Sequence, residues 1–425
     1  MMRSTVVVMA SCLALSACAT VTHRDAPDHR RVSCAWSRHP PGGLQPVDVP
    51  QFVCITFDDN FGSSGTAPTG GVGGIVDFFA GKRNPAGGSD AFAGTPIRCT
   101  FFHTSLYMAD PQHRVHGGRT GEDWTGGNRA AWIAARAAGH EVADHTVNHL
   151  NGGAVPLGTN DLVRPRRWDA ADWMAEIDAC RDMLCDPTTG IGVDRSRIRG
   201  FRAPFLSFDD GLFAALLELG FSYDSSVVGS LGELRDGTDC PWPHTLDHGS
   251  PDAELLTRKL LAMDPSIDVA SMRIGPHPGL WELPPTTLVI PPDDILQSHG
   301  LASGLGERVK EPTALDYSLL ITDGMTAAEM RAVLDHNLDQ HLAGNRAPLV
   351  FVAHSHLYAF TSARENPDTP SLAIRDERWR ALSGFIEYAL SKPEVRVVAA
   401  EDVVDWARKV NEASPKTAPT APGSR

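Results

Sequence analysis

The chain alternates short apolar runs with segments of helical spacing. Runs rich in β-branched and aromatic residues predict strands at 51–57, 97–102, 140–143, 198–201, 223–228, 349–353 and 395–399. Apolar residues at helical spacing predict helices at 75–80, 130–138, 168–184, 212–219, 326–342, 378–390 and 401–410. Strands that alternate with helices favour a parallel α/β sheet or barrel, in which the chemistry gathers at the carboxyl ends of the strands.

Two long stretches interrupt this alternation. Residues 62–95 are rich in glycine, and residues 229–315 are irregular and contain many prolines. Loops of this size in a compact domain are usually functional or mobile. The chain shows no internal repeat and no second periodic domain, so we expect one domain with long insertions over residues 47–411.

The first residues predict export. A short basic start is followed by an apolar run at 4–14, which is too short to span a membrane. Leu15-Ser16-Ala17-Cys18 resembles a bacterial lipobox, in which Cys18 is lipidated, but Ala17-Cys18-Ala19 also fits ordinary signal cleavage. We therefore expect a signal peptide at 1–18, a tether at 19–46 and a disordered tail at 412–425. The expected location is the bacterial cell envelope as a lipoprotein, with a secreted or periplasmic soluble protein as the alternative.

The composition of the chain limits the classes of molecule that we expect it to bind. Of 425 residues, 42% are hydrophobic and 21% charged, which suits a globular domain with a sizeable core. The formal net charge of −14 argues against nucleic acid or an anionic membrane surface, so membrane contact is expected only through a lipid anchor. Six cysteines follow Cys18, and their pairing is open. Cys54 and Cys99 lie in strand-like runs and fit buried small hydrophobes. The oligomeric state is not indicated.

A pair of acids ends the first predicted strand. In Phe52–Asn60, strand-like residues lead directly into Asp58 and Asp59. Two neighbouring carboxylates repel each other, so a cation, a metal or a shared proton should compensate them. The alternative is a solvated turn, since Asp-Asp-Asn-Phe-Gly is good turn chemistry.

Further polar groups follow other predicted strands. His145 and His149 have a spacing that lets both imidazoles reach one ion. With the carboxylate of Asp59 they would form a two-histidine, one-carboxylate set that leaves coordination positions open. Asp58 then remains as a base, and Arg202 can pair with it and keep it ionised.

These clusters carry a family resemblance. Thr56-Phe57-Asp58-Asp59, His145-Thr146-Val147-Asn148-His149 and Arg202-Ala203-Pro204-Phe205 resemble the first three motifs of the polysaccharide deacetylases of the NodB-homology type, carbohydrate esterase family 4. Val352-Ala353-His354 resembles the fifth motif. The resemblance covers roughly residues 50–230 and 345–408 and implies a distorted (β/α) barrel with long loop insertions.

The resemblance also implies roles for single residues. Asp58 would be the general base, with Arg202 orienting it, and His354 the general acid. A divalent metal, most commonly Zn²⁺, would be held by three residues, Asp59, His145 and His149. The backbone N–H of Phe205 would help hold the oxyanion, although the family usually has tyrosine there and glycine in place of Asn60.

Three assignments stay open. The fourth motif has no clear match, and Trp281 is the candidate for its wall, with a core tryptophan as the alternative. Asp264 or Asp316 would tune His354, and His356 competes with His354 as the acid.

The expected function is removal of acetyl groups from N-acetylated glycans of the chitin oligosaccharide or peptidoglycan type. The alternatives are an esterase for O-acetylated polysaccharide, an amide hydrolase that opens cyclic ureides or imides, and a non-catalytic glycan-binding lipoprotein. Export weighs against the ureide hydrolase, and retention of Asp58, Asp59, His145, His149 and Arg202 weighs against the binding protein.

Overall fold

The structure is a computed structural model that describes residues 32–60, 71–109, 122–156, 163–267, 269–359 and 371–413. All of them belong to one compact unit, Val32–Arg425. The expected signal peptide with Cys18, the first part of the expected tether and the tail from residue 414 lie outside the described residues. None of the described helices is long and apolar enough to cross a membrane.

A curled sheet of mainly parallel strands forms the centre of this unit. In the described part of the chain its strands are β1 Gln51–Asp58, β2 Thr100–His103, β3 Glu141–Asp144, β4 Gly200–Phe201, β5 Tyr223–Asp224, β6 His244–Thr245, β7 Trp281–Glu282, β8 Leu349–His354 and β9 Val395–Val397. Their order is β6-β7-β5-β4-β3-β2-β1-β8, with β9 paired to the first residues of β1. Only β6 and β7 pair antiparallel among these strands. The prediction of an α/β fold of the distorted-barrel type is confirmed.

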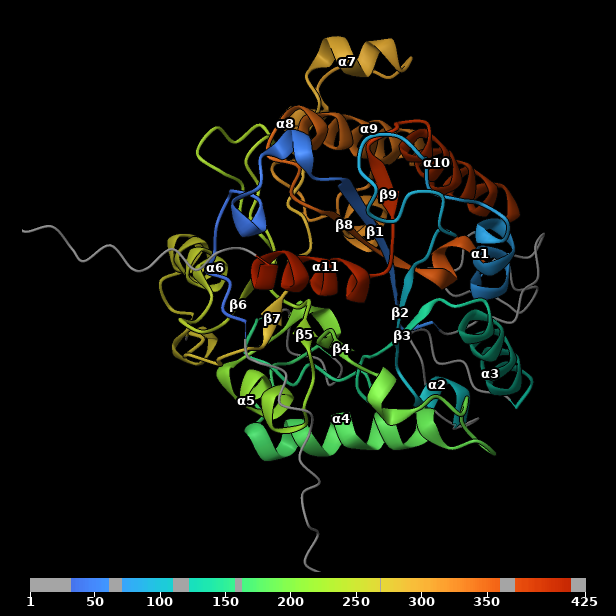
Figure 1. Cartoon of the computed structure of the whole chain (residues 1–425), viewed down its shortest axis with the longest axis vertical. Coiled ribbons are helices and arrows are strands. Elements are labelled where there is room, and N and C mark those ends of the chain that lie inside the picture. The colour runs from blue at the N-terminus through green and yellow to red at the C-terminus, as the bar shows by residue number, and fades with distance from the viewer. Residues whose placement is uncertain are drawn as a thin grey trace, which may run out of the picture. The chain divides into compact units, whose positions relative to one another are not determined.

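Helices pack around the sheet. The described α-helices are α1 Gly71–Phe79, α2 Leu106–Ala109, α3 Glu122–Ala137, α4 Ala170–Cys185, α5 Asp210–Glu218, α6 Pro251–Met263, α7 Asp293–Ser298, α8 Leu305–Arg308, α9 Ala327–Ala343, α10 Leu372–Leu390 and α11 Ala400–Ala413. Short turns of other helix types are η1 Pro41–Gly43, η2 Pro46–Asp48, η3 Arg195–Arg197, η4 Pro204–Leu206, η5 Ala270–Met272, η6 Ser318–Thr322 and η7 Ser355–Tyr358. Figure 1 shows α9 beside α10 at the top of the view and α4 beside α5 at the bottom, with strands between the two pairs.

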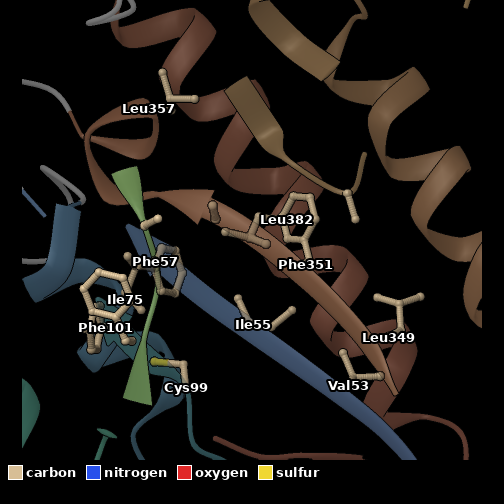
Figure 2. Close-up of a cluster of buried hydrophobic side chains, with 14 of the residues drawn as sticks. Val53, Ile55, Phe57, Ile75, Cys99, Phe101, Leu349, Phe351, Leu357 and Leu382 are labelled. Atoms are coloured by element: carbon tan, nitrogen blue, oxygen red, sulfur yellow. The ribbon is translucent and has the colours of Figure 1, made fainter. Parts of the chain in front are cut away.

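The central strands are buried on both faces, which explains their uninterrupted apolar runs. All eight residues of β1 are buried, and five of the six residues of β8 are. Figure 2 shows side chains of β1 and β8 packed with residues from β2, α1 and α10 in one cluster. Cys54 and Cys99 are buried in such clusters as predicted, and none of the six described cysteines forms a disulfide.

The prediction of an irregular stretch at 229–315 was wrong in part. It contains α6, which begins with a Ser250 cap and a proline at its first position and runs for 13 residues. It also contains the two-residue strands β6 and β7. The signals for α6 are present in Ser250-Pro251-Asp252-Ala253-Glu254, a typical helix start. The strands are too short to show any periodicity.

Helix α9 begins later than its expected cap. We expected Thr322 or Asp323 to cap this helix, but Thr326 does so. The Thr326 hydroxyl accepts the Glu329 N–H, and the Glu329 carboxylate accepts the Thr326 N–H. This reciprocal capping box satisfies two N–H groups that the first turn would otherwise leave exposed.

Candidate active site

The polar clusters meet at one edge of the sheet. Asp58 ends β1 and lies directly opposite His354, which ends β8. Asp144 ends β3 and pairs with Phe201 of β4, so His145 and Arg202 follow neighbouring strands. Because the carboxyl ends of parallel strands share an edge, residues far apart in sequence come together there.

Asp58, His145 and His354 line a cavity of about 480 Å³ at this edge of the sheet. A volume of this order is typical of small-molecule sites. Its lining consists of Asp58, Asp59, His145, His149, Val163, Phe205, Leu206, Leu315, Tyr317, Thr322, His354 and His356.

Asp59, His145 and His149 converge on one point. Oδ1 of Asp59 lies 2.9 Å from Nε2 of His149 and 3.4 Å from Nε2 of His145. This oxygen is buried, and no described residue gives it a partner with hydrogen-bond geometry. Burial would raise the pKa of Asp59, but the two imidazoles lower it well below its ordinary value, so the carboxylate is ionised. Two imidazole nitrogens and one carboxylate fit a divalent metal ion.

The surrounding residues fix the orientation of these groups. Nδ1 of His145 lies 2.7 Å from the carbonyl oxygen of Arg202 and donates to it, which leaves the Nε2 lone pair for a metal. The N–H of His149 donates to the Thr146 hydroxyl at 3.2 Å. The N–H of Thr146 donates to the buried Asp144 carboxylate at 2.9 Å. Burial raises the pKa of Asp144 to about 7, although this hydrogen bond lowers it.

The backbone of the site is in an unusual conformation. Positive φ angles occur at Asp59 (64°), Asn60 (65°), Thr146 (65°), His149 (53°) and Phe205 (61°). Residues other than glycine seldom adopt this region, and such strain concentrates at functional sites. Asparagine tolerates this region better than most residues, and the side-chain amide of Asn60 donates to two backbone carbonyls at 3.0 Å. The strain therefore aims several of the site's side chains at once.

Asp58 is held by Arg202. Nη1 of Arg202 donates to Oδ1 of Asp58 and to the hydroxyl of Thr56, each at 2.7 Å. Nε and Nη2 of Arg202 donate to the carbonyl and hydroxyl oxygens of Ser225 at 2.9 and 2.8 Å. Its guanidinium also lies 4.2 Å from the ring centre of Phe102. The Arg202 side chain is fully buried, and removal of one partner of such a pair costs about 3–5 kcal/mol.

His354 is paired with Asp316. Nδ1 of His354 donates to Oδ1 of Asp316 at 2.7 Å, and its N–H donates to Oδ2 at 2.8 Å. Burial would lower the pKa of His354, but the charge and hydrogen bond of Asp316 raise it to about 9. Asp264, the other expected partner, instead bonds Ser266 just after α6. His356 also lines the cavity.

Phe205 and Trp281 have different positions relative to the cavity. Phe205 lines it, and its ring centre lies 4.6 Å from that of His149. Trp281 is 1% exposed, packs in the core with Tyr223 and Leu283, and is not part of the cavity lining. Its assignment as the cavity wall therefore has no support from the geometry. Leu315 and Tyr317 supply wall residues instead.

Several supporting residues were missed in the sequence. Thr56 and Ser225 hold Arg202; Thr56 stands in the first motif stretch, and Ser225 directly follows β5. They could have been found because they lie beside strand ends. Leu315 and Tyr317 had no such signal, since they lie in a stretch without periodicity.

The fold and the site together define an α/β protein in which three side chains that could hold a metal ion, a buried Asp–Arg pair and a His–Asp pair lie at the carboxyl edge of the sheet. No protein-family model matches the chain. Among curated proteins, chitin deacetylase 1 of Bombyx mori is 25% identical over 331 residues, which are 74% of this chain and 45% of that protein. Chitin deacetylase 8 of the same insect is 22% identical over 374 residues, 87% of this chain and 73% of that protein. The chain thus spans about half the length of the first of these relatives.

Among solved structures, a Mycobacterium smegmatis protein assigned to the polysaccharide deacetylases matches with a TM-score of 0.48 and 17% identity. The match covers 91% of this chain and 98% of that one. The two curated relatives confirm the resemblance of the chain to the polysaccharide deacetylases of the NodB-homology type, carbohydrate esterase family 4.

The relatives correct one expectation. Both curated relatives are proteins of an insect, which contradicts the expectation of a bacterial cell-envelope lipoprotein. That expectation was wrong and is withdrawn. It had rested on residues 1–19, which lie outside the described part of the chain.

Proposed function

We propose that the chain is a metal-dependent hydrolase that removes acetyl groups from N-acetylated glycans of the chitin oligosaccharide or peptidoglycan type. One observation carries the proposal. The buried Asp58–Arg202 pair, the Asp59, His145 and His149 cluster and the His354–Asp316 pair all meet in the same cavity. The names of the two insect relatives support the glycan class.

A divalent metal would be held by Asp59, His145 and His149, and zinc suits this set of nitrogen and oxygen ligands. When bound, it would polarise the acetyl carbonyl and make a water molecule more acidic. The histidines are suited to this because an outer contact fixes Nδ1 of His145 as the donor and leaves Nε2 for the ion.

Asp58 acts as the general base. Arg202 and its partners Thr56 and Ser225 hold the carboxylate in one orientation, so it does not have to be ordered during the reaction. Asp58 takes the proton from the water that attacks the acetyl carbon. General base catalysis of this kind contributes about 10²–10⁴ in rate.

His354 acts as the general acid. With Nδ1–H bonded to Asp316, the proton on Nε2 is the one available to the departing amine. The raised pKa of about 9 keeps this imidazolium protonated at neutral pH. The backbone N–H of Phe205 helps to hold the oxyanion that forms on the carbonyl. Leu206, Leu315 and Tyr317 form the cavity wall against which the acetyl group and sugar pack.

Acetate release from a panel of substrates tests the proposal. The panel holds N-acetylated chitin oligosaccharides, peptidoglycan fragments and O-acetylated xylan, each assayed before chelation, after chelation and after Zn²⁺ is added back. We expect release from an N-acetylated glycan that chelation abolishes and zinc restores. The Asp58→Asn variant should release little acetate even after zinc is added back. The control is Asp182→Asn, whose side chain is 74% exposed on α4.

Other outcomes would contradict the proposal in distinct ways. Release from xylan alone would identify an O-acetyl esterase. Binding of glycans without release in any condition would identify a glycan-binding protein. A rate that chelation leaves unchanged would refute the role of the metal.

A further inference from the structure

A second buried cluster of metal-ligating side chains lies away from the cavity. It consists of His244 on β6, Asp252 in the first turn of α6 and Glu282 on β7. His244 and Glu282 lie directly opposite each other in the antiparallel pair of β6 and β7. His244 and Glu282 are fully buried, and Asp252 is 1% exposed. None of the three lines the cavity of the candidate active site.

The charges of this cluster are not balanced by the described residues. Asp252 and Glu282 are both carboxylates, and within the described ranges neither forms an ion pair with a lysine or arginine. A buried carboxylate pair without a cation is costly, so a compensating positive charge is expected at this place.

Two buried atoms of the cluster have no hydrogen-bond partner among the described residues, Nε2 of His244 and Oε2 of Glu282. Nε2 of His244 lies 3.5 Å from Oε1 of Glu282, beyond the usual length of a hydrogen bond. A protonated Glu282 that donated directly to His244 would bring these atoms closer. The separation instead matches the ~3.3 Å between two ligand atoms that each lie ~2.0 Å from a tetrahedral zinc ion.

Neighbouring groups orient the three side chains. Nδ1 of His244 donates to the carbonyl of Trp242 at 3.2 Å, which leaves Nε2 with a lone pair. The Asp252 carboxylate accepts from the indole N–H of Trp36 and from the N–H of Ser230, each at 2.9 Å. The hydroxyl of Ser250 donates to Oε1 of Glu282 at 3.1 Å. Each ligand is thus held by a contact that does not use up its remaining lone pairs.

We propose that His244, Asp252 and Glu282 bind a second divalent transition-metal ion, with zinc the best match. Their ligand atoms lie within 4.8 Å of one another. The imidazole favours zinc over calcium or magnesium, which prefer oxygen ligands alone. The full burial of the site makes it a structural one, without access for a substrate.

The site joins segments that are distant in sequence. Through its ligands and their partners it connects the N-terminal segment at Trp36, the β6–β7 pair and the start of α6. Residue Leu283, next to Glu282, accepts a hydrogen bond from the hydroxyl of Ser225, which holds Arg202. An ion bound to Glu282 would therefore stabilise β7, which contacts Arg202 through Leu283 and Ser225.

Metal stoichiometry tests this proposal separately from the proposed activity. Each full-length protein is reconstituted with Zn²⁺, dialysed against metal-free buffer and measured by elemental analysis. We expect two zinc ions per chain in the wild type and one in His149→Ala, whose substitution leaves the second cluster intact. Glu282→Gln should also retain one. The matched control is Glu387→Gln, whose side chain is 63% exposed, and it should retain two.

Thermal unfolding gives a readout that does not depend on the folding of Glu282→Gln. The metal-free form of His149→Ala should gain several degrees in Tm when Zn²⁺ is added, because only the folded site binds the ion. If His149→Ala binds no zinc and its Tm does not change when zinc is added, the proposal is overturned. Glu282→Gln that keeps two zinc ions and the wild-type Tm would also overturn it. Loss of acetate release in a chain that still binds two zinc ions would overturn the proposed function alone.

Discussion

Asp316→Asn removes the charge that holds the proton on His354. The Asp316 carboxylate accepts two hydrogen bonds from His354, one from Nδ1 and one from the backbone N–H. Asparagine has one oxygen and can keep only one of them. The pKa of His354 should therefore fall from about 9 toward its ordinary 6.5. That difference amounts to about 3 kcal/mol, at about 1.4 kcal/mol for each tenfold change.

The expected loss of rate follows from the protonated fraction. An acid with a pKa of about 9 is mostly protonated at pH 8, whereas one with a pKa of 6.5 is about 3% protonated. The variant should therefore lose about 30-fold at pH 8 and little at pH 6. The alkaline limb of the pH–rate profile of kcat should move to lower pH. Asp316 is the residue to change because a metal ion at Asp59 would cancel the smaller contribution of that carboxylate.

Stability gives an independent check of the same pair. Because the pKa of His354 is higher in the folded chain than its ordinary value, the pair stabilises the fold fully below pH 6.5, and this stabilisation is lost as the pH rises through about 9. Asp316→Asn should thus lower Tm most at pH 6 and least above pH 9. An alkaline limb in the variant that coincides with that of the wild type would refute the assignment of His354 as the acid.

Four further predictions concern other residues of the molecule. Asp58→Asn should lose about 10²–10⁴ in kcat with its metal content unchanged, measured by acetate release and elemental analysis, and near-full activity would reject the base. His149→Ala should lose one metal ion per chain, and an unchanged metal content would reject the ligand set. Trp281→Ala should destabilise the fold by about 3–5 kcal/mol in denaturant unfolding. Tyr317→Ala should raise KM with little change in stability, because Tyr317 lies on the cavity wall and is 36% exposed.

The reactive groups of the site could be predicted from the sequence because each of them ends a strand or directly follows one. In the strands that carry Asp58 and His354, strong apolar runs fix where the strand ends, and a parallel sheet then brings those ends together. No long-range information was needed beyond the order of the elements. This explains why Asp59, His145 and His149 lie close together and why Arg202 contacts Asp58.

The residues that form the cavity wall could not be predicted from the sequence because their positions depend on tertiary contacts. Leu315 and Tyr317 stand in a stretch without periodicity, which contacts the sheet through a bridge between Leu315 and Val352 and through the hydrogen bonds from His354 to Asp316. Trp281 was the candidate for the cavity wall, yet its two-residue strand pairs on both sides and buries it. Strands this short carry no pattern of their own.

The two kinds of residue in the cavity therefore differ in their freedom to vary. The reactive groups extend from β1, β3, β4 and β8, and a substitution there disturbs the sheet as well as the chemistry. Leu206, Leu315 and Tyr317 belong to segments between strands. Under the proposed function, natural drift or directed evolution could therefore exchange these wall residues and change the acetylated substrate while Asp58, Asp59, His145, His149 and His354 stay constant.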